Sequence, residues 1–261
     1  MKPGRPLTLA ARLLLLLLAA LPTRPVPAQT PAGAPLPTAA ILQPEQQGAQ
    51  LAARLREAAP VAADEFQGSL EIIARDDSIT TLPIVSRITP GTNHWSVSYL
   101  ARDPAGRPLE ELTILHAPGR PNAYRLAAGP ASNTVPAPPL SRPFAGSDFW
   151  LGDLGLEFLH WPGQRVVTNE MRHSRSCWVL ESTTPKPEPG GYARVLSWID
   201  VEHDGILRAD AHGPDGRLLK EFRLGPMRKI DGRWQLESMK MRTRATDSET
   251  ELRFNLARPG R

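Results

Sequence analysis

The chain has 261 residues, a formal net charge of +4 at pH 7 and a single cysteine, Cys177. Its basic and acidic residues alternate along the sequence instead of forming a basic cluster, and this pattern excludes a nucleic-acid-binding footprint. One cysteine cannot form an intrachain disulfide, so the fold depends on an apolar core, in which we expect Cys177 to be buried.

Residues 1–28 have the pattern of a cleaved secretory signal peptide. A basic start is followed by an apolar run over 13–21 and a small-residue cleavage site at 26–28. The run is short for a bilayer span, although an uncleaved N-terminal anchor remains the alternative. Removing this segment leaves 27 basic residues against 27 acidic ones. We therefore predict a soluble, exported protein with a disordered linker over 29–43 and a single domain over 44–261.

The first element predicted in the mature chain is a helix over residues 44–59. Pro44 fits the first turn of a helix, and Pro60 ends it. Its apolar face, which includes Leu51 and Leu55, is narrow. We expect this helix to lie on a surface rather than cross a core.

Runs of alternating apolar and polar residues predict about eleven strands. They cover residues 66–75, 82–89, 94–101, 109–116, 165–174, 177–184, 193–201, 206–211, 218–224, 234–242 and 249–256, with one further short strand at 124–127. Asp-Gly pairs at 204–205, 215–216 and 231–232 separate several of these runs. Such turns favour an antiparallel up-and-down sheet.

Residues 144–162 form the most aromatic stretch, with five of the fifteen aromatic residues of the chain. Placed on a helix, their apolar side chains cover most of the circle, and only Asp153, Glu157 and His160 share a polar strip. Gly152 and Gly155 each disfavour a helix by roughly 1 kcal/mol. We predict a helix here that other elements must enclose, with the two glycines as a hinge.

These elements predict an α+β fold that is mainly antiparallel β. The expected architecture is an open half β-barrel of about eleven strands, with helices covering or plugging its concave face. A sheet of this size curls, and the aromatic helix can occupy the hollow. The alternative, a two-sheet sandwich, leaves that helix without a place.

The sequence contains none of the G-x-S-x-G, H-E-x-x-H, P-loop and C-x-x-C motifs. Two groups of side chains are candidate sites, namely a metal cluster of His203, Asp204, Asp210 and His212 and paired carboxylates among Asp148, Asp153 and Glu157. Turn formation and helix capping explain both groups more simply. We expect no enzymatic activity, no cofactor and no metal; a hydrolase using His160 or His173 is the weakest alternative.

The aromatic stretch and the strands behind it also resemble a known family. The features that carry the resemblance are Gly146-Ser147-Asp148-Phe149 with Asp153-Leu154, then Tyr192 to Val195 with Trp198-Ile199-Asp200, then Asp215 to Lys220, and then Trp234. In order and spacing they resemble the outer-membrane lipoprotein-sorting proteins of the LolA-like type, over roughly residues 66–255. The resemblance implies a periplasmic carrier whose open β-barrel, covered by helices, holds acyl chains in an apolar cavity.

We predict a periplasmic carrier that binds acyl chains of lipoproteins, or a related lipid, and moves them toward the outer membrane without spanning a membrane. Its partners would include an inner-membrane transporter and an outer-membrane acceptor. The predicted cavity residues are Trp95, Tyr99, Phe149, Trp150, Leu154, Phe158, Trp178 and Trp198. The alternative is a periplasmic adaptor of an envelope transport complex without lipid cargo, in which these aromatic residues form an ordinary core.

Overall fold

The computed structural model describes residues 43–129, 133–172, 174–230 and 233–255. The predicted signal peptide and all but the last residue of the predicted linker lie outside these ranges. The predicted N-terminal helix is confirmed as α1 (Pro44–Glu57), which buries Leu51, Ala52 and Leu55 on one side. Within the described ranges, no helix combines the length and the apolar character needed to cross a membrane.

Most of the described chain is antiparallel strand, as the alternating pattern predicted. The strands are β1 (Asp64–Ile73), β2 (Ile79–Pro90), β3 (Trp95–Arg102), β4 (Pro108–His116), β5 (Ala123–Ala128), β6 (Asn133–Pro136), β7 (Gly163–Arg172), β8 (Arg175–Thr183), β9 (Arg194–Asp200), β10 (Ile206–His212), β11 (Leu218–Leu224), β12 (Met227–Ile230), β13 (Arg233–Leu236), β14 (Ser238–Thr243) and β15 (Ser248–Phe254). β6 and β12 were not predicted, and the strand expected over 234–242 is divided between β13 and β14.

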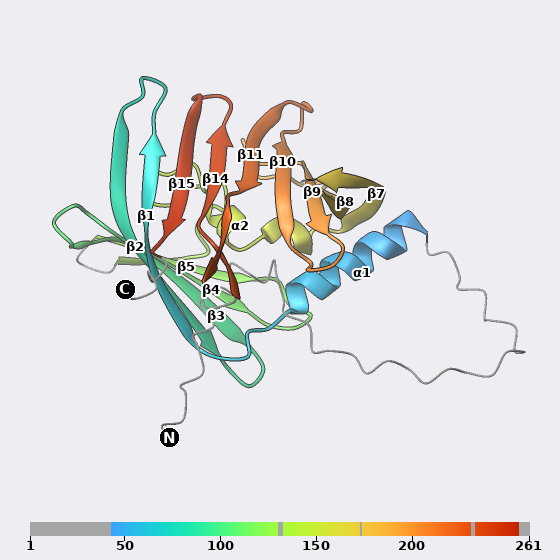
Figure 1. The fold of residues 1–261 in the computed structure, drawn as a ribbon, viewed down its shortest axis with the longest axis horizontal. Helices are drawn as coiled ribbons and strands as arrows, with labels where there is room; N and C mark the ends of the chain where they lie inside the picture. Colours follow the sequence, from blue (N-terminus) through green and yellow to red (C-terminus); the bar gives the residue numbers. More distant parts are fainter. Residues whose placement is uncertain (1–42, 130–132, 173, 231–232, 256–261) are drawn as a thin grey trace, which may run out of the picture.

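Thirteen of these strands form one sheet, in the order β6-β5-β4-β3-β2-β1-β15-β14-β11-β10-β9-β8-β7. β12 and β13 form a separate hairpin. The last strand pairs with the first in the middle of the sheet, from Gly68 opposite Phe254 to Ile73 opposite Glu249. The sheet is curled but not closed, and α2 lies within its curve (Figure 1). The predicted open half-barrel is confirmed.

This strand order explains why the aromatic stretch lies inside the curve. β6 and β7 are consecutive in the chain but occupy opposite edges of the sheet. Residues 137–162, which we call the crossing segment, must therefore run from one edge to the other. Because the sheet is curled, a path along the concave side joins the edges and covers the apolar face at the same time.

The crossing segment is not the continuous helix that the sequence predicted. It contains one α-helical turn, α2 (Leu151–Leu154), and one 3-10 turn, η1 (Glu157–His160). Between them Leu156 has a positive φ of 50°, which is incompatible with a continuous right-handed helix. A Cβ atom on Gly155 would lie 2.1 Å from the Tyr124 hydroxyl oxygen, so close packing against β5 requires glycine here. The helical projection could not reveal this contact.

The two ends of the crossing segment belong to different apolar cores. The first core joins β1 to β5, β14 and β15 with Phe144, Phe149 and Leu151. The second core joins α1 and β7 to β10 with Phe158 and Leu159 of η1. Of the strand residues between them, Phe222 on β11 contacts both cores. The middle of the crossing segment therefore lies over the boundary between the two cores.

Helix α1 protects one edge of the sheet. It lies along β7, and a Cβ atom on Gly48 would be 2.4 Å from the backbone nitrogen of Arg165. Such close contact shields an edge strand that would otherwise be available for pairing with another chain. Arg54 also donates to Asp204, at 2.6 Å, and links α1 to the turn between β9 and β10.

Candidate functional site

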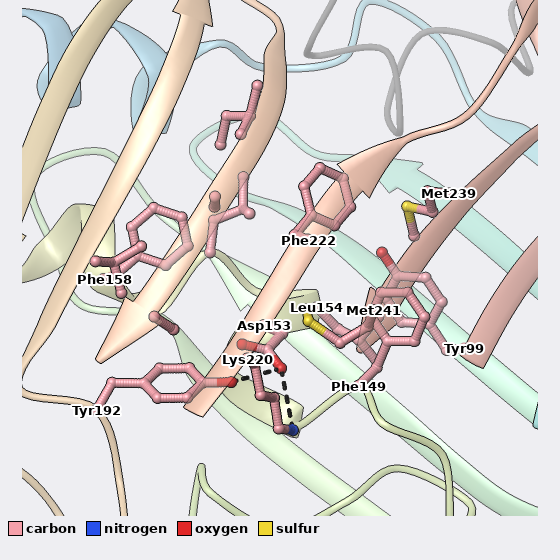
Figure 2. Close-up of a pocket in the computed structure, with 15 residues that line it drawn as sticks. Tyr99, Phe149, Asp153, Leu154, Phe158, Tyr192, Lys220, Phe222, Met239 and Met241 are labelled. Atoms are coloured by element: carbon pink, nitrogen blue, oxygen red, sulfur yellow. Dashed lines mark hydrogen bonds and ion pairs between the residues drawn. The ribbon is translucent and has the colours of Figure 1, made fainter. Parts of the chain in front are cut away.

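An apolar cavity of about 100 Å³ lies under the middle of the crossing segment, where the two cores meet. Its walls come from β3, β9, β10, β11 and β14, and its cover comes from Phe149, Leu154, Leu156 and Phe158. Figure 2 shows side chains from the sheet and from the crossing segment, among them Phe222, Phe149 and Phe158, around one space.

Strand alternation explains why this wall is apolar. Ala209 and Ala211 on β10 and Met239 and Met241 on β14 each lie two residues apart, so each pair faces the same side of the sheet. The two alanines leave the space that larger side chains would occupy. Methionine is unbranched and adapts to irregular shapes, so the β14 side of the wall can follow a ligand of variable form.

One end of the cavity is polar. There the Nζ atom of Lys220 lies 3.8 Å from Oδ2 of Asp153, and the hydroxyl of Tyr192 donates to the same oxygen at 3.3 Å (Figure 2). Burial lowers the pKa of Lys220 to about 8, although Asp153 and Asp148 favour its charged form. Burial also raises the pKa of Asp153, and Lys220 opposes that shift. The three side chains form one coupled polar group in an otherwise apolar site, which we call the polar end.

Two further hollows border the crossing segment. One of about 130 Å³ separates it from the loop before β9, and Trp150 stacks there on Tyr192 with ring centroids 4.5 Å apart. The other, of about 60 Å³, opens toward α1 between His116 and His160. Both adjoin the cavity, because each shares lining residues with it. The middle of the crossing segment thus borders three hollows, although Gly155 packs closely against Tyr124.

Polar side chains replace the hydrogen bonds that a continuous helix would supply to the crossing segment. Asn122 donates to the carbonyl of Gly155 at 2.8 Å, and Gln164 donates to the carbonyl of Phe158 at 2.9 Å. The carboxylate of Glu188 accepts from the backbone of Leu140 at 3.1 Å and also from that of Ser141. A buried backbone group needs such a partner, so these contacts stabilise a segment that does not form a continuous helix.

The structure places the predicted cavity residues in five different surroundings. Tyr99, Phe149, Leu154 and Phe158 line the cavity. Trp150 lines the second hollow, and Trp95 lines the third, where it stacks on His116 at 3.7 Å between ring centroids.

The last two predicted tryptophans lie away from the cavity. Trp178 packs against the second core. Trp198 lies on the opposite face of β9 from Val195 and Ile199, under the guanidinium of Arg208. Both faces of β9 have apolar residues, so its sequence pattern does not indicate which face points inward.

Several cavity residues were missed by the sequence reasoning. They are Leu156, Tyr192, Val195, Ile206, Ala209, Ala211, Lys220, Phe222, Met239 and Met241, together with Asp153, which was interpreted only as a helix cap. The every-second-residue pattern on β10, β11 and β14 was visible and could have identified most of them. What the pattern could not show is that these strands lie beneath the aromatic stretch.

The carboxylates that the sequence offered as candidate sites have structural partners. Asp153 accepts from the backbone of Trp150 at 2.8 Å, so its predicted capping role is confirmed alongside its contact with Lys220. Asp148 does not cap a helix, because its carboxylate accepts from Ser248 and Thr250 instead.

The three remaining candidate carboxylates also have partners. Glu157 accepts from Tyr124 at 2.9 Å. In the proposed metal group, Asp204 pairs with Arg54 and Asp210 pairs with Arg208. His173 lies outside the described residues.

Comparisons with known proteins agree on the fold. A family model described as "-like: Uncharacterized protein" matches residues 130–260, half of the chain. No curated protein matches the sequence. A DUF1329 family protein from Desulfovibrio piger superposes with a TM-score of 0.66 at 18% identity, covering 84% of this chain and 96% of that chain.

Two further solved structures are similar. A putative outer membrane lipoprotein-sorting protein domain from Vibrio parahaemolyticus has a TM-score of 0.66 at 18% identity, covering 82% of this chain and 92% of its own. A LolA superfamily protein from Nitrosomonas europaea has a TM-score of 0.57 at 19% identity, with 84% and 96% covered. At these identities the similarity is one of fold.

Proposed function

Since this chain belongs to a family with the LolA-like fold, we propose that it is a periplasmic carrier for acyl chains of lipoproteins or of a related lipid. It shields the chains in the apolar cavity and moves them toward the outer membrane without catalysing a reaction. An inner-membrane transporter would load it, and an outer-membrane acceptor would unload it. The observation that carries the proposal is an apolar cavity beneath a crossing segment whose middle borders two further hollows.

The physical need for such a cavity follows from the cost of exposing lipid to water. Each CH₂ group of an acyl chain is stabilised by roughly 0.8 kcal/mol when it leaves water. A carrier must therefore offer apolar side chains on several sides of the chain. Phe149, Phe158, Phe222, Met239 and Met241 supply such surfaces around the cavity.

The size of the cavity indicates how a ligand would enter. At about 100 Å³ it is smaller than the engineered cavity of roughly 150 Å³ that holds benzene, so a long acyl chain does not fit without a change in shape. Moving residues 152–157 away from the sheet would merge the cavity with the two neighbouring hollows. Leu156, whose positive φ is unfavourable for a non-glycine residue, lies within the part that would move. Loading is therefore coupled to displacement of the crossing segment.

The proposal is tested by the lipid content of the protein and by binding of a fluorescent acyl probe. The protein is purified from the periplasm and analysed by native mass spectrometry before and after delipidation. Ala211→Phe fills the cavity from β10 and should abolish probe binding. Ala105→Phe adds the same side chain in the exposed turn between β3 and β4 and should leave binding unchanged. Absence of bound lipid together with absence of probe binding contradicts the carrier function.

A periplasmic adaptor without lipid cargo is the second candidate. The small volume of the cavity favours it, because side chains of the protein already occupy most of the concave face. In that case Ala211→Phe would have no effect on function, and the partner would bind the outside of the sheet. The same probe experiment distinguishes the two candidates.

A further inference from the structure

The charged side chains at the polar end of the cavity affect which ligands the cavity can bind. The side chains of Lys220 and Asp153 are 2% and 9% exposed, so water screens their charges weakly. The Nζ atom of Lys220 donates to the backbone carbonyl of Asp148 at 2.5 Å and lies 3.8 Å from the ring centroid of Trp150. With Asp153 as an ion-pair partner, the three N–H bonds of the ammonium group are directed at groups of the protein itself.

Two carboxylates surround this single ammonium group. Besides Asp153, the carboxylate of Asp148 lies close enough to favour the charged form of Lys220. Asp148 is held by hydrogen bonds from Ser248 at 2.6 Å and Thr250 at 2.8 Å. Counted formally, Lys220, Asp153 and Asp148 together have a net charge of −1. Among the residues that line the cavity, Lys220 is the one cation.

A free carboxylate on a ligand would therefore meet an unfavourable site. It would lose its hydration in a buried space, and the ammonium that could compensate is already paired with Asp153. The nearby carboxylates would repel it. An ester or amide avoids both costs, because it has no net charge that would lose hydration or be repelled. An amide N–H can also donate to the phenol oxygen of Tyr192, which retains acceptor capacity while its proton is directed at Asp153.

We propose that the polar end makes the cavity selective for uncharged acyl groups, that is esters and amides, against free fatty acids. Asp153 is the residue that determines this selectivity, because it neutralises Lys220 and faces the ligand. The inference rests on the proposed carrier function and specifies its ligand class. It would keep the carrier free of fatty acids while acyl chains that are esterified or amide-linked are bound.

The test compares two ligands of equal chain length, a fluorescent fatty acid and its methyl ester, at pH 7. The wild-type protein should bind the ester about tenfold more tightly or better. Asp153→Asn keeps the side-chain shape but releases the charge of Lys220, so it should shift the ratio of the two affinities toward the acid by about tenfold. Lys220→Met removes the cation and should shift the ratio further toward the ester.

Asp204→Asn is the matched control, because it is the same change in an exposed turn and should leave the ratio unchanged. The wild-type ratio alone tests the proposal if a variant does not fold, which circular dichroism will report. Equal or tighter binding of the acid by the wild-type protein overturns the inference, as does an ester preference that Asp153→Asn leaves unchanged. Binding of neither ligand instead contradicts the carrier function itself.

Discussion

The two ends of the crossing segment are buried in the two apolar cores, whereas most residues in its middle are only half-buried. In the first core Phe144, Phe149 and Leu151 are at most 2% exposed, and in the second Phe158 and Leu159 are 7% and 1% exposed. Residues 152–157 lie between these anchors and border three hollows. The comparison shows how a segment can be stable in the fold and still have a movable centre.

The difference between the anchors and the middle follows from the strand order. The segment has to reach both edges of the sheet, so each end packs where it meets its own edge. Neither core extends far enough to fill the space at their boundary, where the alanines of β10 leave room. As a result, the ends of the crossing segment are more deeply buried than most of its middle.

The largest expected effect comes from removing the anchors themselves. Leu151→Ala and Leu159→Ala should each lower the free energy of unfolding by about 2–5 kcal/mol, because each deletes a fully buried side chain. Urea denaturation followed by tryptophan fluorescence measures both. A loss below about 1 kcal/mol for either variant would show that its end of the segment is not anchored.

The two glycines of the segment should respond in opposite ways. Gly155→Ala places a methyl group against Tyr124 and should lower stability by about 1–3 kcal/mol. Gly152→Ala is the matched control, because its nearest neighbour is Cβ of Leu140 at 3.3 Å, and it should be neutral or stabilise by up to about 1 kcal/mol.

Gly152→Ala also tests whether the middle moves. It should slow the exchange of a bound acyl probe, measured by stopped-flow fluorescence, because it stiffens the turn at α2. Exchange at the wild-type rate would locate the opening motion elsewhere in the segment.

The third hollow predicts a pH dependence. Burial lowers the pKa of His116, on β4, to about 4 from 6.5, and burial has the same effect on the pKa of His160, on η1. The unfolded chain therefore binds protons at these sites below about pH 6.5 before the folded chain does, so their contribution to stability falls as the pH drops from about 6.5 through about 4.

Thermal unfolding at several pH values between 4 and 7 measures this loss. Replacing both histidines with glutamine should flatten the slope. Asp153 and Glu157, whose pKa values are raised by burial, contribute with the opposite sign and are unchanged in the variant. An identical slope in the variant would exclude the histidines as its cause.

The smallest effect is expected at the surface contact between α1 and the sheet. Arg54 and Asp204 are 53% and 30% exposed, so Arg54→Met should change the free energy of unfolding by less than about 1 kcal/mol. The helix is held by Leu51, Ala52 and Leu55 in the second core instead. A much larger loss in urea denaturation would mean that the ion pair positions α1.

The strands were predictable because their alternation is local information. Residues 95, 97 and 99 share a face in the sequence pattern and are buried together in the first core. The pairing of β15 with β1 was not predictable, since it joins residues about as far apart as the described chain allows. Without that pairing, the sequence could not show that β6 and β7 become the two edges.

The candidate site was predictable only in part for the same reason. The aromatic stretch drew attention to Phe149, Leu154 and Phe158, which line the cavity. The opposite wall and the polar end depend on which strands lie beneath the stretch. From the sequence alone, Lys220 is an ordinary lysine on a predicted strand. Only the fold places it beside Asp153.

The methionines allow the most direct measurement of the central claim, that the cavity takes an acyl chain. Met239 and Met241 are 6% and 5% exposed and line the cavity, whereas Met171 is 65% exposed near the end of β7 and serves as an internal control. In NMR spectra of isotope-labelled methionine methyl groups, an acyl methyl ester should shift the Met239 and Met241 signals and give contacts to the ligand, while Met171 stays unchanged. Unchanged Met239 and Met241 signals at saturating ligand would contradict the account.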